Sequence, residues 1–266
     1  MAFRDVLVHA PKESLTYLRP GDDYALGGLV VHVAAVLRHY LAVMDAIVAA
    51  GFGVSRPSNP KGLFEVAAAR AHAGLQPTER VGALKEMAEL HGRVRDRMAS
   101  VTFSEWERKA PVWYSDEELY PTSLADIAGW LTDHYLEHVP QVGSLLADWR
   151  TLQVVEGFNR AFGRRDVEGV MDAMTPDCVF ENTFPAPDGE RFEGAEAVAD
   201  FWRQFFAATP SARWEQEEAL AAGDRAVVRW ILRWDEGSDN RGHVRGVDVF
   251  RVRNGKIAEK LSYVKG

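Results

Sequence analysis

The hydrophobic pattern of this 266-residue chain changes its period close to residue 150. Before that point, apolar residues recur at the three- and four-residue spacing of amphipathic helices, whereas from about residue 177 they alternate with the period of two that is typical of strands. Helical segments followed by strand segments predict a domain boundary and an α+β second half. We therefore expect two domains, an all-α four-helix bundle in residues 1–149 and an α+β domain with a curved antiparallel sheet in residues 150–266.

The individual elements follow from the same periodicity and from turn and cap residues. For the bundle we expect a shorter N-terminal helix and three longer helices, at residues 3–18, 24–50, 77–100 and 123–149. Ser123 and Asp126 fit a capping box at the start of the last one. For the second domain we expect helices at 151–163, 166–174 and 195–208, and strands at 177–183, 213–220, 225–234, 243–252 and 256–264. The pair Asn254–Gly255 predicts a hairpin between the last two strands.

Charge and cysteine content limit the partners of the chain. The formal net charge is −8, and acidic and basic residues are interspersed. This distribution lacks a basic patch, so we expect a small-molecule or protein partner, with no nucleic acid and no membrane. The first residues do not resemble a signal peptide, and no uncharged segment reaches the ~20 residues of a membrane span. Cys178, the single cysteine, is expected in the core, and its lack of a disulfide partner favours a cytoplasmic location.

Three histidines form a candidate metal site. His134 and His138 lie four residues apart on the inward face of a predicted helix, and His32 lies midway along the apolar helix 24–50. Three imidazoles can hold a divalent ion and leave coordination positions open, as in a catalytic site. Gln141, near His138, could fix the orientation of its ring. The alternative is that these are core histidines satisfied by hydrogen bonds, because Tyr135 follows His134 where zinc proteases have a glutamate.

The segments LVVHVAAVLRHYL and GWLTDHYLEHVPQV resemble the DinB/YfiT-like four-helix bundle superfamily over roughly residues 1–149. This resemblance implies a divalent ion, Zn²⁺ or Ni²⁺, held by His32, His134 and His138. It also implies, from some relatives, that the metal activates the sulfur of a low-molecular-weight thiol. His39 is an outside candidate for a ligand, and His9, His72 and His91 are expected at the surface or in packing contacts.

The second half resembles the SnoaL-like, nuclear-transport-factor-like fold, a curved sheet wrapped round helices to form a cone with an apolar pocket. The matching segments are EGFNRAFGRRDVEGVMDAM, DCVFENT, GAEAVADFWRQFF and GVDVFRVRNGKIAEKLSYV. This fold hosts many unrelated functions, so the resemblance implies the fold and not the reaction.

Comparison with ketosteroid isomerase, which shares this fold, argues against steroid-type isomerisation. Asn182 stands where the isomerase has its general-base Asp, and Phe158 where it has an oxyanion-hole Tyr. Asp248 matches the acid that the isomerase keeps protonated. In limonene epoxide hydrolase, an acid occupies the position of Ser262.

Alternation in RAVVRWILRW predicts which side chains line the pocket. Val228, Trp230, Leu232 and Trp234 share one face, and we expect it to point inward. The candidates for ligand binding are Phe158, Asn182, Trp202, Trp214, Trp230 and Ser262, with His243 near the mouth and Asp248 as the candidate catalytic acid. Alternatively, the aromatic residues only fill the core and Asp248 is a buried residue bonded to the backbone. The opposite face, with Arg225, Arg229 and Arg233, suggests a homodimer surface.

These features support three hypotheses. The first is a metal-dependent enzyme in which the histidines hold an ion that activates water or a thiol, giving a hydrolase or a thiol-dependent transferase or isomerase, while the second domain binds substrate or mediates dimerisation. The second is a small-molecule binding protein that uses the cone pocket without catalysis. The third is an interaction module in which neither site is active.

Overall fold

The computed structural model describes residues 3–58, 62–235, 237 and 241–265. The chain divides into two compact units, Met1–Leu146 and Ala147–Gly266. Helix α6, Leu124–Gly163, runs through this division, and the boundary expected between residues 149 and 150 falls inside it. The two helices expected at 123–149 and 151–163 are thus one continuous helix.

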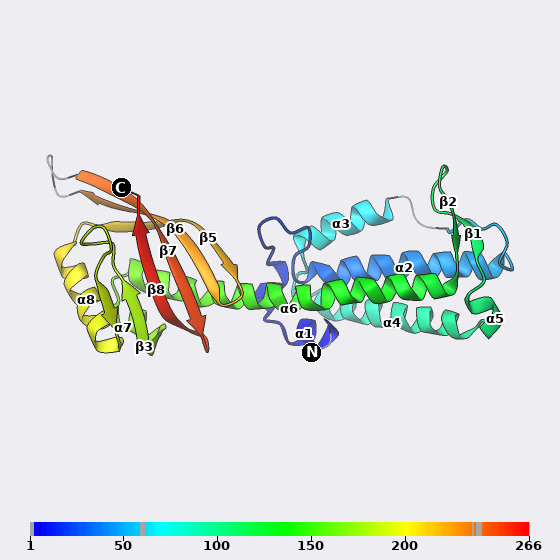
Figure 1. Ribbon diagram of the computed structural model, residues 1–266, viewed down its shortest axis with the longest axis horizontal. Helices are drawn as coiled ribbons and strands as arrows, with labels where there is room; N and C mark the ends of the chain where they lie inside the picture. The colour runs from blue at the N-terminus through cyan, green and yellow to red at the C-terminus, as the bar shows by residue number, and fades with distance from the viewer. Residues whose placement is uncertain (1–2, 59–61, 236, 238–240, 266) are drawn as a thin grey trace. The chain divides into compact units, whose positions relative to one another are not determined.

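The first unit is a helical bundle, as predicted. Helices α2 (Gly28–Ala49), α4 (Arg80–Ala99) and the first part of α6 lie side by side, and the short helix α1 (Phe3–His9) packs on α4 (Figure 1). The core between them is made by apolar side chains that are almost fully buried, among them Val33, Leu37, Met44, Leu90 and Ile127. Burial of this apolar surface is the main favourable term in the stability of such a bundle.

The N-terminal helix is shorter than the predicted range 3–18. Helix α1 ends at His9, and a 3₁₀ helix, η1, follows at Lys12–Thr16. Pro11 explains the break, because proline lacks the backbone N–H group and disfavours helical geometry in the residue before it.

Helix α3, Leu63–Ala73, has no counterpart in the sequence-based expectations. Only two small side chains, Ala67 and Ala71, are buried on it, so the sequence shows little contrast between its faces. It packs closely on α2 at Gly28, where an added Cβ atom would lie 1.7 Å from the carbonyl oxygen of Ala71. The small residues therefore allow the two backbones to approach.

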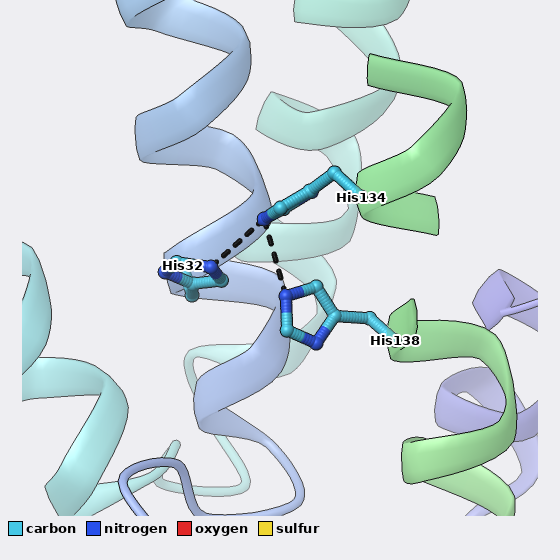
Figure 2. Close-up of side chains that lie close together, drawn as sticks. All are labelled: His32, His134 and His138. Carbon is cyan, nitrogen blue, oxygen red and sulfur yellow. Dashed lines mark hydrogen bonds between the residues drawn. The ribbon is translucent and has the colours of Figure 1, made fainter. Parts of the chain in front are cut away.

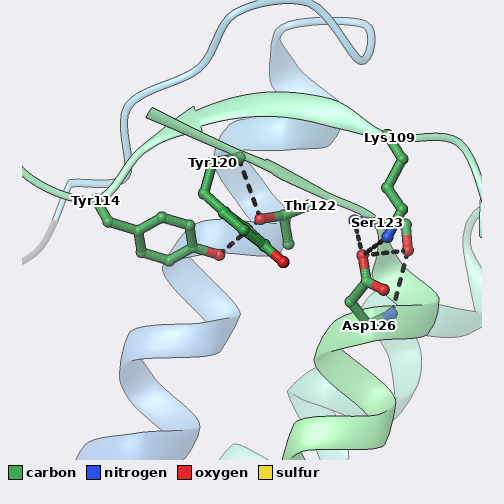
Figure 3. A network of polar contacts seen from close by, with 6 residues as sticks. All are labelled: Lys109, Tyr114, Tyr120, Thr122, Ser123 and Asp126. Atoms are coloured by element: carbon green, nitrogen blue, oxygen red, sulfur yellow. Dashed lines mark hydrogen bonds and ion pairs between the residues drawn. The ribbon is translucent and has the colours of Figure 1, made fainter. Parts of the chain in front are cut away.

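The segment before α6 contains short elements that the sequence did not predict. Helix α5 (Phe103–Trp106) is followed by strands β1 (Ala110–Trp113) and β2 (Leu119–Thr122), which pair antiparallel. The predicted capping box at the start of α6 is confirmed: the Ser123 amide donates to Oδ2 of Asp126 at 2.7 Å, and the Asp126 amide donates to Oγ of Ser123 at 3.1 Å (Figure 3). Lys109 also contacts Asp126, and the Tyr114 hydroxyl lies 3.0 Å from that of Thr122.

Helix α2 is long and apolar enough to cross a membrane by length and composition alone. Its side chains are largely buried within the bundle, with Leu29, Val33 and Ile47 fully covered. This is the behaviour of a core helix in a soluble protein, and it accounts for the hydropathy of α2 without a membrane.

The second unit is an α+β domain whose sheet has the strand order β4-β3-β8-β7-β6-β5. The strands are β3 (Met174–Glu181), β4 (Arg191–Glu193), β5 (Arg213–Ala222), β6 (Arg225–Asp235), β7 (Arg241–Arg253) and β8 (Lys256–Val264). The helices are the end of α6, α7 (Val167–Asp172) and α8 (Ala195–Ala208), and α8 packs on β3 (Figure 1). The core contains Phe158, Phe180, Trp202, Phe250 and, as predicted, the buried Cys178.

The expectation of a purely antiparallel sheet was wrong in one pairing. Strand β3 runs parallel to β8, while the other neighbours in the sheet are antiparallel. Parallel neighbours need a long connection, and the chain between β3 and β8 supplies it with a helix and several strands. The predicted hairpin at Asn254–Gly255 is confirmed, with positive φ angles at both residues.

Strand β8 contains a register shift close to this hairpin. Arg251 pairs with Glu259 and Val252 pairs with Ile257, so Ala258 is an extra residue in β8. Ile257 and Ala258 are both buried, and the alternation then resumes with Lys260 pointing inward. A bulge of this kind changes which side chains of a strand face the core.

Candidate functional site

The structure brings the three predicted histidines together. His134 and His138 lie one turn apart on α6, and His32 faces them from α2 (Figure 2). The Nε2 atom of His134 is 2.9 Å from Nε2 of His32 and 3.1 Å from Nε2 of His138. His138 is buried, and the other two are half-buried.

The geometry of this cluster fits a bound cation. One ligand atom from each histidine lies within 4.8 Å of the others, and each of the two close contacts joins Nε2 atoms. Metal–nitrogen bonds of ~2.0–2.1 Å place neighbouring ligand atoms ~3.0–3.4 Å apart, close to the observed separations. Nδ1 of His134 is also buried, and it has no hydrogen-bond partner in the part of the chain that the structure describes. Imidazole nitrogens suit several divalent ions, zinc and nickel among them.

The ring of His138 is oriented by Gln141. Oε1 of Gln141 lies 2.7 Å from Nδ1 of His138. Because a carbonyl oxygen only accepts hydrogen bonds, Nδ1 of His138 carries the hydrogen and Nε2 keeps its lone pair for the centre of the cluster. The contact expected between Gln141 and His138 is therefore present. It fixes the tautomer of the imidazole as well as the position of the ring.

Burial and repulsion between the imidazoles keep His32 and His134 neutral. Desolvation, with repulsion from His134 and His138, lowers the pKa of His32 to about 4. Desolvation and repulsion from His138 also lower the pKa of His134 to about 4, against the opposing effect of Glu137. These two imidazoles are therefore unprotonated at neutral pH, which is the form that can coordinate a cation.

Tyr24 is a member of this site that the sequence analysis did not identify. Its ring stacks on His32, with centroids 4.2 Å apart, and it meets His138 edge-on at 6.0 Å. Burial, with the charges of Asp23 and Glu137, raises the pKa of its phenol group. The predicted helix 24–50 included Tyr24, but α2 begins at Gly28 and Tyr24 lies in the irregular segment before it. Only the fold therefore places Tyr24 against the histidines.

The other histidines of the bundle lie apart from the cluster. His39, the outside candidate, packs against the rings of Tyr40, Phe64 and Tyr114. His91 is 2.5 Å from the hydroxyl of Tyr135 through Nε2, and its Nδ1 contacts the carbonyl oxygen of Met87. His91 is thus in a packing contact, as expected.

A cavity of about 90 Å³ lies inside the second unit. It is lined by seven of the residues singled out from the sequence: Phe158, Asn182, Trp202, Trp214, Trp230, Asp248 and Ser262. His243 lines a larger cavity of about 1260 Å³, which shares Phe162, Phe205, Trp214 and Leu232 with the smaller one. The smaller cavity therefore adjoins the larger one through aromatic and apolar walls.

Lys260 is a charged residue of this cavity that the sequence analysis missed. Its ammonium nitrogen is 2.9 Å from Oδ2 of Asp248 and 2.6 Å from Oγ of Ser262, and the Ser262 hydroxyl donates to Oδ1 of Asp248 at 2.7 Å. Asp248 thus has a charged partner, which neither the isomerase comparison nor the backbone-bonded alternative anticipated. Basic residues are rarely fully buried, so the strand pattern alone favoured an exposed lysine.

Fold and geometry together define a protein with a histidine cluster in a helical bundle and an aromatic cavity in an α+β cone. Residues 1–142 match the family model of the DinB superfamily, and residues 155–260 match that of the SnoaL-like domain. The chain belongs to the DinB superfamily and carries a SnoaL-like domain after its bundle.

Several solved structures are similar to part of the chain. An NTF2-like protein of unknown function from Mesorhizobium loti is 37% identical, with 45% of this chain and 93% of that chain covered and a TM-score of 0.40. An NTF2-like protein from Burkholderia pseudomallei is 23% identical, with 44% and 91% covered and a TM-score of 0.39. An LEH-like epoxide hydrolase from M. tuberculosis is 22% identical, with 44% and 84% covered and a TM-score of 0.37. The curated proteins contain no significant match.

Proposed function

We propose that the bundle is a metal centre in which His32, His134 and His138 hold one divalent ion, Zn²⁺ or Ni²⁺, and that this centre makes the chain a metal-dependent enzyme. The observation that supports it most is the convergence of three Nε2 atoms, two of the separations being 2.9 and 3.1 Å. Membership of the DinB superfamily supports the same reading.

The number of protein ligands indicates which reactions the bound ion would support. Three protein ligands leave coordination positions open, and a bound ion there would lower the pKa of a coordinated water or thiol. The chain contributes a fixed donor set, with Gln141 holding His138 and Tyr24 covering His32. We therefore favour a hydrolase or a thiol-dependent transferase or isomerase.

Metal content tests the centre directly. Protein purified without chelator should contain about one Zn²⁺ or Ni²⁺ per chain by elemental analysis, the count expected for a single three-histidine site. His134→Ala should lose the metal, whereas His39→Ala, which changes a histidine outside the cluster, should keep it. Wild-type protein without a transition metal that also fails to take up added Zn²⁺ or Ni²⁺ would contradict the proposal.

Cobalt substitution distinguishes the thiol from the water reaction. If Co²⁺ loaded in place of the native ion coordinates a thiolate, titration with glutathione or cysteine should produce a sulfur-to-cobalt charge-transfer band in the near ultraviolet. A spectrum unchanged by these thiols, with hydrolysis of activated esters that depends on the metal, would favour the hydrolase.

A second candidate function is small-molecule binding by the cone without catalysis, and one observation favours it. Trp202 and Trp230 line the cavity, and their indole nitrogens are buried without a hydrogen-bond partner among the residues that the structure describes. Buried donors of this kind are costly unless a ligand or water accepts from them. A thermal-shift screen of wild type and Asp248→Ala tests it, because ligands of the cavity should stabilise only proteins with an intact site.

Assembly as a homodimer and a cytoplasmic location complete the proposal. The arginine face of the sheet is the surface we propose for dimer packing, although its arginines already pair within the chain, with Arg229 bound to Glu217 and Glu218 and Arg233 to Glu215. An interface there would be polar. The mass in solution by light scattering, for wild type and for Arg229→Glu, tests the dimer.

A further inference from the structure

Lys260 is almost fully buried, which is rare for a lysine with only a structural role. Its side chain is 7% exposed, and that of Asp248, its partner, is 3% exposed. The ammonium nitrogen also lies over the rings of Phe180, Trp202 and Phe250, at 5.0, 5.8 and 5.8 Å from their centroids. Removing two charges from water costs several kcal/mol for each ion, and an apolar pair in their place is often no less stable. The stability of the fold alone therefore does not explain why this position carries an ion pair instead of two apolar residues.

The surroundings of Lys260 favour a reactive amine. Burial lowers the pKa of its ammonium group, although the Asp248 carboxylate acts in the opposite direction. A lysine desolvated in an apolar pocket is more nucleophilic than one in water, because more of it is in the unprotonated form. Lys260 lines the cavity of about 90 Å³, so a small molecule in that cavity would meet it.

The walls of the cavity indicate what kind of molecule it would take. Phe158, Phe162 and Trp214 make its lining largely aromatic, which favours an uncharged molecule. The indole N–H groups of Trp202 and Trp230, which have no acceptor among the described residues, favour a ligand that carries hydrogen-bond acceptors. A small molecule with carbonyl oxygens satisfies both conditions, and its carbonyl carbon is the electrophile with which a free amine reacts.

We propose that Lys260 is the nucleophile of an imine-forming site in the cone, which takes a small uncharged aldehyde or ketone. Asp248 moves the protons, and Ser262 holds the carboxylate in place. This site uses none of the residues of the histidine cluster and does not depend on a metal.

Lys260 and Asp248 can supply and accept every proton that imine formation requires. The ammonium of Lys260 gives one proton to the Asp248 carboxylate, and the free amine adds its lone pair to the carbonyl carbon. The Asp248 carboxyl protonates the resulting alkoxide and the carboxylate then takes a proton from the nitrogen, which gives a neutral carbinolamine. The carboxyl protonates the hydroxyl group, which leaves as water while the nitrogen lone pair forms the C=N bond. The product is a protonated imine beside an ionised Asp248, with no change of oxidation state.

Reductive trapping tests the proposal on the wild-type chain. The protein is incubated at neutral pH with acetaldehyde, acetone or benzaldehyde in the presence of sodium cyanoborohydride, and the adducts are located by peptide mass spectrometry. Lys256, exposed at the start of the same strand, is the internal control. A lowered pKa raises the unprotonated fraction of an amine at neutral pH, so Lys260 should be labelled several-fold faster than Lys256 by one or more probes.

Variants separate the chemistry from folding and from the metal centre. Lys260→Arg keeps a cation beside Asp248 but cannot form an imine, so it should abolish the fast adduct while leaving circular dichroism unchanged. His134→Ala should keep the adduct, so that loss of metal and loss of imine formation are separate results. Labelling of Lys260 by all three probes at a rate no faster than that of Lys256 would overturn the proposal, and this comparison needs no variant to fold.

Discussion

The ring of Tyr24 stacks on the imidazole of His32, with the centroids 4.2 Å apart and the planes inclined by 22°. This contact holds the one ligand of the histidine cluster that does not come from α6. Tyr24→Ala should therefore weaken metal binding by about tenfold, the lower end of the effect of partners that orient metal ligands. Competition with a chromophoric chelator measures it. Tyr24→Phe keeps the ring and should bind like wild type, and an equal loss in both variants would show that the hydroxyl matters instead.

Gln141 fixes the tautomer of His138, so its substitution should weaken metal binding. We expect Gln141→Leu to lower metal affinity by ~10–100-fold, because Nδ1 of His138 would lose the acceptor at 2.7 Å. Gln141→Glu retains an acceptor and serves as the matched control. Identical affinities for wild type and Gln141→Leu in the chelator competition would mean that the ring is held by packing alone.

The stability of the metal-free protein should fall as the pH is lowered through the histidine range. The pKa of His32 and of His134 is about 4 in the folded chain, against ~6.5 in an unfolded one. Between these values the unfolded state binds more protons, so the free energy of unfolding is undiminished above pH ~6.5 and decreases towards pH ~4. Urea denaturation at several pH values measures this slope. The double variant with His32→Leu and His134→Leu should have a shallower slope, and equal slopes would contradict the assignment.

Gly246 on β7 leaves room for the indole of Trp230. A Cβ atom there would lie 2.2 Å from Cζ2 of Trp230 and 2.5 Å from the carbonyl oxygen of Tyr263. Gly246→Ala should destabilise the second unit by about 1–3 kcal/mol, the usual cost of overpacking. Gly163→Ala, where nothing lies within 4 Å of the added atom, is the control for chemical denaturation. A neutral Gly246→Ala would show that Trp230 and the strand can shift.

The ion pair of Asp248 and Lys260 should show strong coupling in a double-mutant cycle. Asp248→Leu leaves a buried ammonium without a counter-charge and should cost ~3–5 kcal/mol of unfolding free energy. Lys260→Met should cost a similar amount. The double variant should be close to wild type, because both charges are removed together. Additive losses in the double variant would show that the two residues stabilise the fold independently.

The helical cluster could be located from sequence because its signal is local. His134 and His138 are four apart on a strongly periodic helix, and the apolar residues Ile127, Leu131 and Leu145 identify the buried face on which they lie. The helix, the capping box at Ser123 and the pairing with His32 followed from that pattern and from the resemblance. Tyr24 was not found, because the predicted helix 24–50 included it, whereas the structure places it in an irregular segment before α2 whose path sets its position against His32.

The cone was predicted less completely, for a different reason. The strands and the hairpin at Asn254–Gly255 have clear local signals. The parallel pairing of β3 with β8 joins residues far apart in the chain, such as Phe180 and Lys260, and nothing in the periodicity of either strand encodes it. Strict alternation from the buried Ile257 would also place Glu259 and Leu261 inside and Lys260 outside.

The extra residue Ala258 therefore has a consequence for how this domain can diverge. Lys260 lies three positions after Ile257, so a straight strand of the same length would turn Lys260 and Ser262 away from Asp248. Deletion of Ala258 would remove the bulge and leave both side chains facing Asp248. A relative that is one residue shorter after the hairpin would thus keep the charged cavity without a bulge, whereas a relative of equal length with a straight strand would exchange it for an apolar one. The backbone geometry at this point, more than the identity of the aromatic residues, would then distinguish reactive cones from inert ones.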